Sequence, residues 1–403
     1  MVSPVTATAV PAPPPRRRSH TRTVLAPVLG LIALGLCALI LLGLGTAKVG
    51  QLPVLVGAAA ALLPVGPVVA AFLWLDRWEP EPPKLLWLCF AWGACGATTC
   101  SLLINSTAEA LGDRVLGHGG GDTIAATVSA PVVEEAAKGV LLIGLLVLRR
   151  RELNGLVDGV VYAGFTAAGF AFTENIYYFG RVFADYGFGN ATSGVIAAFI
   201  LRGVLAPFTH PLFTAMMGIG IGIAARHRGR KVAVVAPLAG YLAAVLLHSL
   251  WNSSATLGGA NAFLTVYFLV ILPLLVAMIT LVVWQRRREQ RVIAKRLPGM
   301  VNAGWIARSE VDLLASLPGR RSWRAKARQR GGRPAARAVS DYQTAVTELA
   351  FLVDAAEHGR VGRDTEERQQ ALLTAMRAAR VAASRASVSR KTARQGHGQR
   401  QGR

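Results

Sequence analysis

The sequence predicts an all-α fold: a polytopic transmembrane helix bundle of about eight spans, followed by a basic, partly helical cytoplasmic tail. Three observations predict this class. The 403-residue chain is 53% hydrophobic and only 16% charged, with a mean hydropathy of +0.42. Its apolar runs reach about 20 residues, the length at which a helix crosses a bilayer. Much of the net charge of +22 lies from residue 285 onward, where 26 Lys and Arg accompany 10 Asp and Glu.

The elements follow in order along the chain. Residues 1–23 are rich in Pro, Ala and Thr and end in basic residues, which is typical of a disordered arm. Residues 24–284 form the predicted transmembrane domain. Its predicted spans are 24–46, 52–75, 85–105, 124–148, 155–176, 194–225, 232–251 and 262–284.

Two predicted loops and one predicted helix break lie among these spans. A glycine-rich stretch at 112–122 and an aromatic stretch at 177–190 are predicted to be loops, the second at a lipid–water boundary. Pro207 lacks the N–H that a helix interior requires, so the region 194–225 is predicted to be broken.

The basic residues predict the orientation of the bundle. Clusters at 149–151, 226–231 and 286–296, and another before the first span, alternate with loops that are poor in Lys and Arg. The positive-inside rule then places both termini in the cytoplasm of a multi-pass cell-membrane protein.

The tail, residues 285–403, contains two helical patterns, at about 340–357 and 365–387. Its juxtamembrane cluster at 286–296 favours contact with anionic lipid headgroups. The tail has no nucleic-acid recognition motif, so no specific nucleic-acid partner is predicted.

Charged side chains inside the predicted spans are the main functional signal. Glu134 and Glu135 lie in the span 124–148, where each charge costs at least about 2.5 kcal/mol at the bilayer centre. Lys138 lies four residues after Glu134, on one helix face, and is expected to pair with it. Glu135 is expected to lack a local partner and to find one on another helix. The plain alternative is a buried ion pair that fixes helix packing.

Polar groups on three other spans reach a similar predicted depth. Glu174 and Asn175 end the fifth span, His210 lies in the broken region, and His248 and Asn252 share one face of the seventh. With a rise of about 1.5 Å per residue, all of these lie in the outer half of the bilayer. One histidine alone is commonly an interhelical hydrogen bond. Agreement between four helices predicts a single wet cavity that opens outward.

These residue types allow several chemistries. His210 and His248 can hold Zn²⁺ while a glutamate serves as general base. Without a metal, a glutamate base can act with His and Asn donors to an oxyanion. Proton relays and proton-coupled transporters use the same groups, and a membrane scaffold that recruits a partner through its tail is a further alternative. The sequence has no HExxH and no Gly-x-Ser-x-Gly motif.

Four stretches within residues 52–284 carry a family resemblance. They are Leu75-Asp-Arg-Trp-Glu-Pro-Glu-Pro82, Pro131-Val-Val-Glu-Glu-Ala-Ala-Lys138, Gly169-Phe-Ala-Phe-Thr-Glu-Asn175 and Leu247-His-Ser-Leu-Trp-Asn252. The chain resembles the PrsW family of intramembrane proteases, which is distantly similar to the CAAX prenyl proteases. At one position the CAAX branch has histidine, whereas this chain has Glu174, which resembles the PrsW branch.

The resemblance implies a membrane peptidase, glutamate-dependent or metal-dependent, that cuts a membrane-anchored protein such as an anti-sigma factor near the outer face. It implies catalytic roles for Glu134, as the water-activating carboxylate, and for Glu135, His248 and Asn252. Lys138, Glu174 and Asn175 are expected to support them, and His210 and His248 are the candidate ligands of a metal, with Zn²⁺ the candidate cofactor.

Overall fold

The computed structural model describes residues 20–77, 80–117, 120–153, 155–227, 229–357 and 365–400. The named elements within these ranges are all helices, and they form no sheet. The predicted all-α class is therefore confirmed. Most of the predicted N-terminal arm, residues 1–19, lies outside the described residues.

Within the part of the chain that the structure describes, seven helical segments are long and apolar enough to cross a membrane. They are Val28–Val49, Gln51–Leu75, Pro83–Val115, Leu156–Tyr186, Gly194–Arg226, Arg230–Thr256 and Gly259–Asn302. The elements that form them are α1 (His20–Val49), α2 (Gln51–Leu75), α3 (Pro83–Ala91), η1 (Trp92–Ala97), α4 (Thr98–Leu116), α7 (Leu156–Tyr186), α8 (Gly194–Phe199), η4 (Ile200–Leu205), α9 (Thr209–Arg226), α10 (Arg230–Thr256), α11 (Gly259–Val266), η5 (Tyr267–Ile271) and α12 (Leu272–Asn302).

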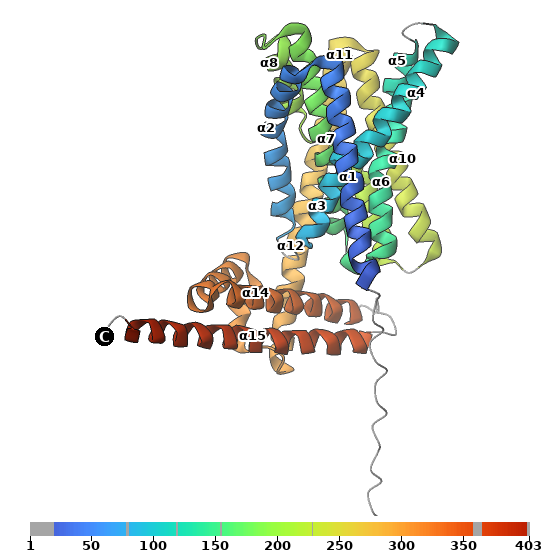
Figure 1. Ribbon diagram of the computed structural model, residues 1–403. Helices are drawn as coiled ribbons and strands as arrows, with labels where there is room; N and C mark the ends of the chain where they lie inside the picture. The colour runs from blue at the N-terminus through green and yellow to red at the C-terminus, as the bar shows by residue number, and fades with distance from the viewer. Residues whose placement is uncertain are drawn as a thin grey trace, which may run out of the picture.

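The predicted fourth span, 124–148, is also helical. It consists of the end of α5 (Gly120–Ile124), then η2 (Ala125–Ser129) and α6 (Ala130–Leu148). Its three charged residues set it apart from the seven apolar segments, yet α6 lies among them in the bundle (Figure 1). The start of α1 and the end of α12 lie at the same end of the bundle, called here the tail end; the opposite end is the far end (Figure 1).

Helix α7 is the centre of the bundle and is mostly buried, with α2 and α9 packed along it. Small residues allow this close approach: a Cβ placed on Gly159 of α7 would lie 2.1 Å from the backbone oxygen of Gly218 on α9. Glycines at helix–helix contacts let backbones come together in apolar surroundings. This contact fixes α9, which carries His210, against α7, which carries Glu174.

The two predicted loops are wrong in part, because a helix extends into each of them. Helix α4 continues to Leu116 within the stretch 112–122, and α7 continues to Tyr186 within the stretch 177–190. Hydropathy marks the apolar part of a helix, whereas backbone hydrogen bonding continues beyond it. The predicted interruption at Pro207 is confirmed, since η4 ends at Leu205 and α9 begins at Thr209.

The tail forms a helical unit with its own apolar core. Its elements are η6 (Arg308–Glu310), α13 (Val311–Ala315), α14 (Leu317–Glu357) and α15 (Thr365–Arg400), so both predicted tail helices are confirmed as parts of longer ones. Ile293, Leu297 and Met300 of α12 contribute to this core, which links the tail directly to a membrane helix. Helices α14 and α15 lie side by side across the tail end of the bundle (Figure 1).

Candidate active site

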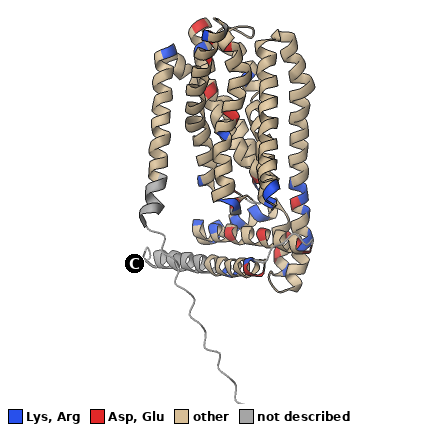
Figure 2. Cartoon of the chain, turned by 90° about the vertical axis from the view of Figure 1, so that its right-hand side faces the viewer, with Lys and Arg blue, Asp and Glu red and all other residues tan. Residues whose placement is uncertain are grey.

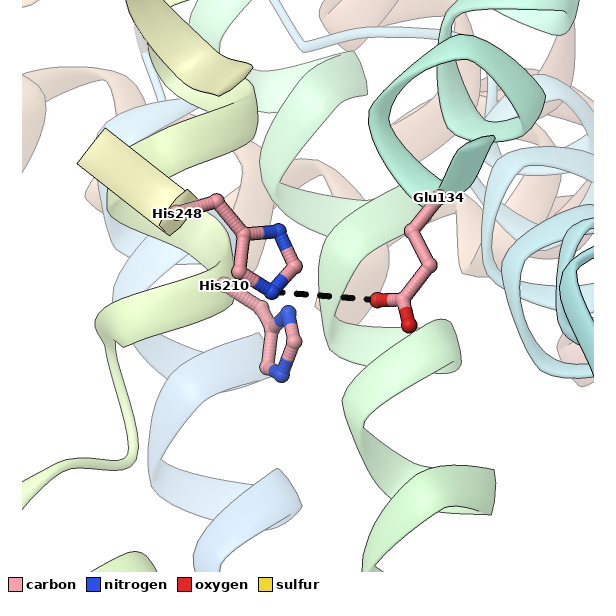
Figure 3. Close-up of side chains that lie close together, drawn as sticks. All are labelled: Glu134, His210 and His248. Carbon is pink, nitrogen blue, oxygen red and sulfur yellow. Dashed lines mark ion pairs between the residues drawn. The ribbon is translucent and has the colours of Figure 1, made fainter. Parts of the chain in front are cut away.

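Four helices bring the predicted acidic and imidazole side chains together. Figure 3 shows Glu134 from α6 pointing toward His210 from α9 and His248 from α10. Glu134 Oε2 lies 3.9 Å from His248 Nε2. One ligand atom from each of the three residues lies within 4.8 Å of the others, so this group could hold a metal ion. The predicted meeting of carboxylate and imidazole groups from separate spans is confirmed.

The surroundings of the Glu134 carboxylate indicate whether this group of residues suits a metal ion. Glu134 is buried, and its Oε2 atom has no hydrogen-bond partner among the described residues. A buried polar atom without a partner is costly, typically by about 1–3 kcal/mol. Since zinc sites combine carboxylate oxygen with histidine nitrogen, two histidines and one glutamate fit Zn²⁺.

Each imidazole is held by a second carboxylate on its other nitrogen. His210 Nε2 lies 2.7 Å from Glu174 Oε2, and His248 Nδ1 lies 3.1 Å from Glu135 Oε1. A histidine that binds a metal usually donates its other N–H in this way, which fixes the ring orientation. The candidate ligand atoms are therefore the nitrogens that face away from these two carboxylates, His248 Nε2 and His210 Nδ1, and the second of them also contacts Lys138 Nζ.

The Lys138 ammonium group lies within this cluster and is fully buried. Its Nζ atom is 2.8 Å from Glu135 Oε1, 3.3 Å from His210 Nδ1 and 3.7 Å from Glu134 Oε2. A second cation, Arg202, pairs with Glu174. Lys138 and Arg202 thus balance two of the three carboxylates, Glu134, Glu135 and Glu174. With neutral imidazoles the set keeps one excess negative charge, which favours a bound cation.

The expectation that Glu135 has no local partner is wrong. Lys138 is closer to Glu135 than to Glu134, because residues three apart on a helix are also neighbours. Thr214 donates a hydrogen bond of 2.9 Å to Glu135 Oε2. Thr214 was not expected in the site, although its position four residues after His210 places it on the same face of α9.

Two predicted residues lie at the edge of the cluster. The side-chain amide of Asn252 donates to the backbone oxygen of Ala126 in η2, at 2.9 Å. This bond satisfies a carbonyl in a π-helical turn that precedes Glu134, and the catalytic role of Asn252 stays a prediction. Asn175 is buried and lines a small cavity with Pro207 and residues of α2 and α7.

The described residues of the stretch 75–82, which are 75–77 and 80–82, do not contribute to this cluster. The backbone N–H of Glu81 donates to both carboxylate oxygens of Asp76, at 3.1 and 3.0 Å. The hydroxyl of Tyr162 on α7 donates to Glu81. These bonds fasten the connection between α2 and α3 onto α7, so the motif stabilises the bundle.

Arg202 was not predicted as a site residue. Its guanidinium donates to Glu174 Oε2 at 2.7 Å, the same oxygen that His210 contacts. An arginine inside an apolar run is the sequence signal that could have identified it.

The comparisons with known proteins agree with this geometry. No curated protein and no solved structure matches the chain. Residues 81–278 match the model of the PrsW family intramembrane metalloproteases, and this range contains all the cluster residues described above. Residues 81–278 of this multi-pass membrane protein are therefore a PrsW family intramembrane metalloprotease domain, and the chain is a peptidase.

Proposed function

We propose that the chain hydrolyses a peptide bond of a membrane-anchored protein, of the anti-sigma-factor kind, near the outer face of the cell membrane. The observation that carries the proposal is the buried Glu134 oxygen, without a hydrogen-bond partner among the described residues, that faces two carboxylate-held histidines. A site of this composition combines a proton acceptor with a cation site inside an apolar bundle.

Glu134, His210 and His248 would hold Zn²⁺. When bound, Zn²⁺ polarises a carbonyl group and makes water more acidic. Of the three carboxylates, Glu134 has the oxygen, Oε2, without a hydrogen-bond partner among the described residues, and this oxygen would serve the ion. We assign proton transfer to the second oxygen of the same carboxylate. The Glu134 carboxylate accepts a proton from the attacking water, whose oxygen adds to the carbonyl carbon. The same proton then passes to the amide nitrogen as the carbon–nitrogen bond breaks.

The surrounding side chains hold this arrangement. Glu135 orients His248, and Glu174 orients His210. Lys138 neutralises Glu135 and keeps a positive charge near the reacting carbonyl oxygen, where it would stabilise an oxyanion. Asn252 lies one turn after His248 on α10 and would reach an oxyanion only by leaving the backbone oxygen of Ala126.

The orientation of the bundle supports cleavage near the outer face. We assign the tail end to the cytoplasm, because the Lys and Arg residues concentrate at that end of the bundle (Figure 2). Glu174 lies 18 residues after the start of α7 and 12 before its end, and His248 lies 18 after the start of α10 and 8 before its end. The site is therefore displaced toward the outer face on these helices. The basic segment 286–296 and the tail would contact anionic headgroups at the inner face.

The test is cleavage of a membrane-tethered reporter by the purified chain in liposomes. We expect Glu134→Gln to abolish cleavage, because an amide neither accepts the proton nor ligates the ion as well as a carboxylate. A strong chelator should abolish wild-type activity, and Zn²⁺ should restore it. Unchanged cleavage in Glu134→Gln would refute the assigned residue, and cleavage that survives metal removal would refute the metal.

A further inference from the structure

One carboxylate oxygen links the outer part of the bundle to a candidate metal ligand. Glu174 Oε2 lies 2.7 Å from Arg202 Nη2 and 2.7 Å from His210 Nε2. The Glu174 side chain is 33% exposed and that of Arg202 26%, whereas that of His210 is only 9% exposed. The ion pair therefore stands between solvent or lipid and the buried imidazole.

The helix break at Pro207 is what allows both residues to reach the same oxygen. In a continuous helix, residues eight apart are separated by about 12 Å along the axis. Here η4 ends at Leu205 and α9 starts at Thr209, so the chain changes course between Arg202 and His210. Both side chains then converge on α7.

Arg202 is fixed to α7 at two adjacent points. Besides its ion pair with Glu174, its guanidinium carbon lies 4.4 Å from the ring centre of Tyr178. Glu174 and Tyr178 are four residues apart on α7 and so share a face. An arginine stacked on an aromatic ring presents its N–H groups in a fixed direction, which lysine does not reproduce.

We propose that Arg202 is a positioning residue for metal binding: it holds Glu174 against His210 Nε2, and this fixes His210 with Nδ1 directed at the Glu134–His248 group. The inference rests on the proposed metal-dependent function. Without Arg202, the Glu174 carboxylate is free to rotate toward solvent, and the His210 ring loses its fixed orientation. Partners of this kind commonly change metal affinity by about 10-fold to 100-fold.

The test measures Zn²⁺ affinity of the purified full chain by competition with a chromophoric chelator. Arg202→Gln is expected to weaken Zn²⁺ binding about 10-fold. Arg202→Lys keeps the charge but loses the fixed geometry, and it should fall between Arg202→Gln and wild type. Arg202→Met, whose apolar side chain has a similar length, gives a second measurement if Arg202→Gln does not fold, and the same loss is expected.

A matched control and a kinetic readout separate positioning from a merely structural role. Arg181→Gln removes an exposed arginine from α7, the helix that carries Glu174, and should leave Zn²⁺ affinity unchanged. At saturating Zn²⁺, Arg202→Gln should reach most of the wild-type turnover number, and its KM should stay close to the wild-type KM. Folded Arg202→Gln or Arg202→Met with wild-type Zn²⁺ affinity would overturn this inference alone. A wild-type chain that cleaves without binding Zn²⁺ would overturn both this inference and the metal in the proposed function.

Discussion

Lys138 shows how the site depends on one buried cation. It is fully buried, it contacts Glu135 and His210, and its ammonium group lies 4.0 Å from the ring centre of Phe170. A buried lysine is tolerated only when its charge is compensated. The adjacent glutamates of α6 and this lysine therefore act as one unit, and removing one member leaves the others uncompensated.

We predict that Lys138→Met destabilises the protein by about 3–5 kcal/mol, since it leaves the Glu135 carboxylate without its cation. Glu135→Gln added to Lys138→Met should restore part of this loss, because the amide carries no charge. Denaturant unfolding in detergent measures both. Equal losses in the single and the double variant would show that the two side chains are not coupled.

Asp76 provides a pH-dependent prediction at the tail end of α2. Burial raises the pKa of its carboxyl to about 7 from an ordinary value of 3.8; the hydrogen bond from Glu81 opposes this shift, and the charge of Asp158 adds to it. Because the pKa is higher in the folded state, folding favours the protonated form. The contribution of Asp76 is therefore greatest below about pH 4 and is lost as the pH rises to about 7.

We expect Asp76→Asn to be more stable than wild type above pH 7, by about 2 kcal/mol, and to show a smaller decline between pH 4 and pH 7. Asparagine keeps an oxygen acceptor for the Glu81 N–H. Thermal unfolding at pH 4 and pH 8 measures this difference. If wild type and variant lose the same stability over this range, another group is responsible for the pH dependence.

At the scale of elements, the contact between α7 and α9 sets the distance between Glu174 and His210. A Cβ on Gly159 would meet the backbone of α9, which cannot yield as a flexible side chain would. A Cβ on Gly144 of α6 would meet no atom of a neighbouring helix within 4 Å, so this glycine lies in the same bundle without the constraint.

We predict that Gly159→Ala destabilises the protein by about 1–3 kcal/mol and lowers activity, because α9 must move away from α7. Gly144→Ala is the matched control and should be neutral or slightly stabilising, as alanine favours helix. Unfolding curves and reporter cleavage measure both effects. Equal behaviour of the two variants would mean that the α7–α9 contact does not position the site.

The same elements show which features a sequence can predict. Apolar runs predict the helices, because a bilayer requires about 20 apolar residues per crossing. Charges in these runs identify Glu134, Glu135, Glu174, His210 and His248, since each needs a partner. The distances between helices are not encoded locally, so the sequence could not assign Arg202 to Glu174. On α6 itself, the spacing allows Lys138 to pair with Glu134 or with Glu135, and the sequence alone does not decide between them. Nor could it place the amide of Asn252 on the backbone of η2.

On the scale of the whole molecule, the tail joins the bundle through one continuous helix. Helix α12 leaves the bundle and enters the tail core, where Arg296 pairs with Asp354 and Glu357 of α14. Among the tail residues that the structure describes, none belongs to the Glu134 cluster. The Glu134 cluster and the described part of the tail are thus built from separate parts of the chain.

We predict that anionic lipid raises cleavage by the full chain, because the tail would contact its headgroups, and that deleting residues 292–403 leaves cleavage in place but reduces this dependence. The deletion keeps the arginines at 286–288 and 291, which would anchor α12 at the inner face in the proposed orientation. Activity in liposomes with and without phosphatidylglycerol measures the effect, with the full chain as reference. Complete loss of cleavage in a folded truncated protein would show that the tail is part of the catalytic unit.

The depth of the site has a consequence for what can be cut. Backbone amides inside a helix are engaged in hydrogen bonds and are surrounded by side chains, so a coiled segment cannot present its carbonyl carbon to a nucleophile. A target that crosses the membrane as a helix must therefore unravel locally before it reaches the Glu134 cluster. Residues that weaken helices, such as glycine and proline, close to the outer end of a target's membrane segment should then decide which proteins are cleaved.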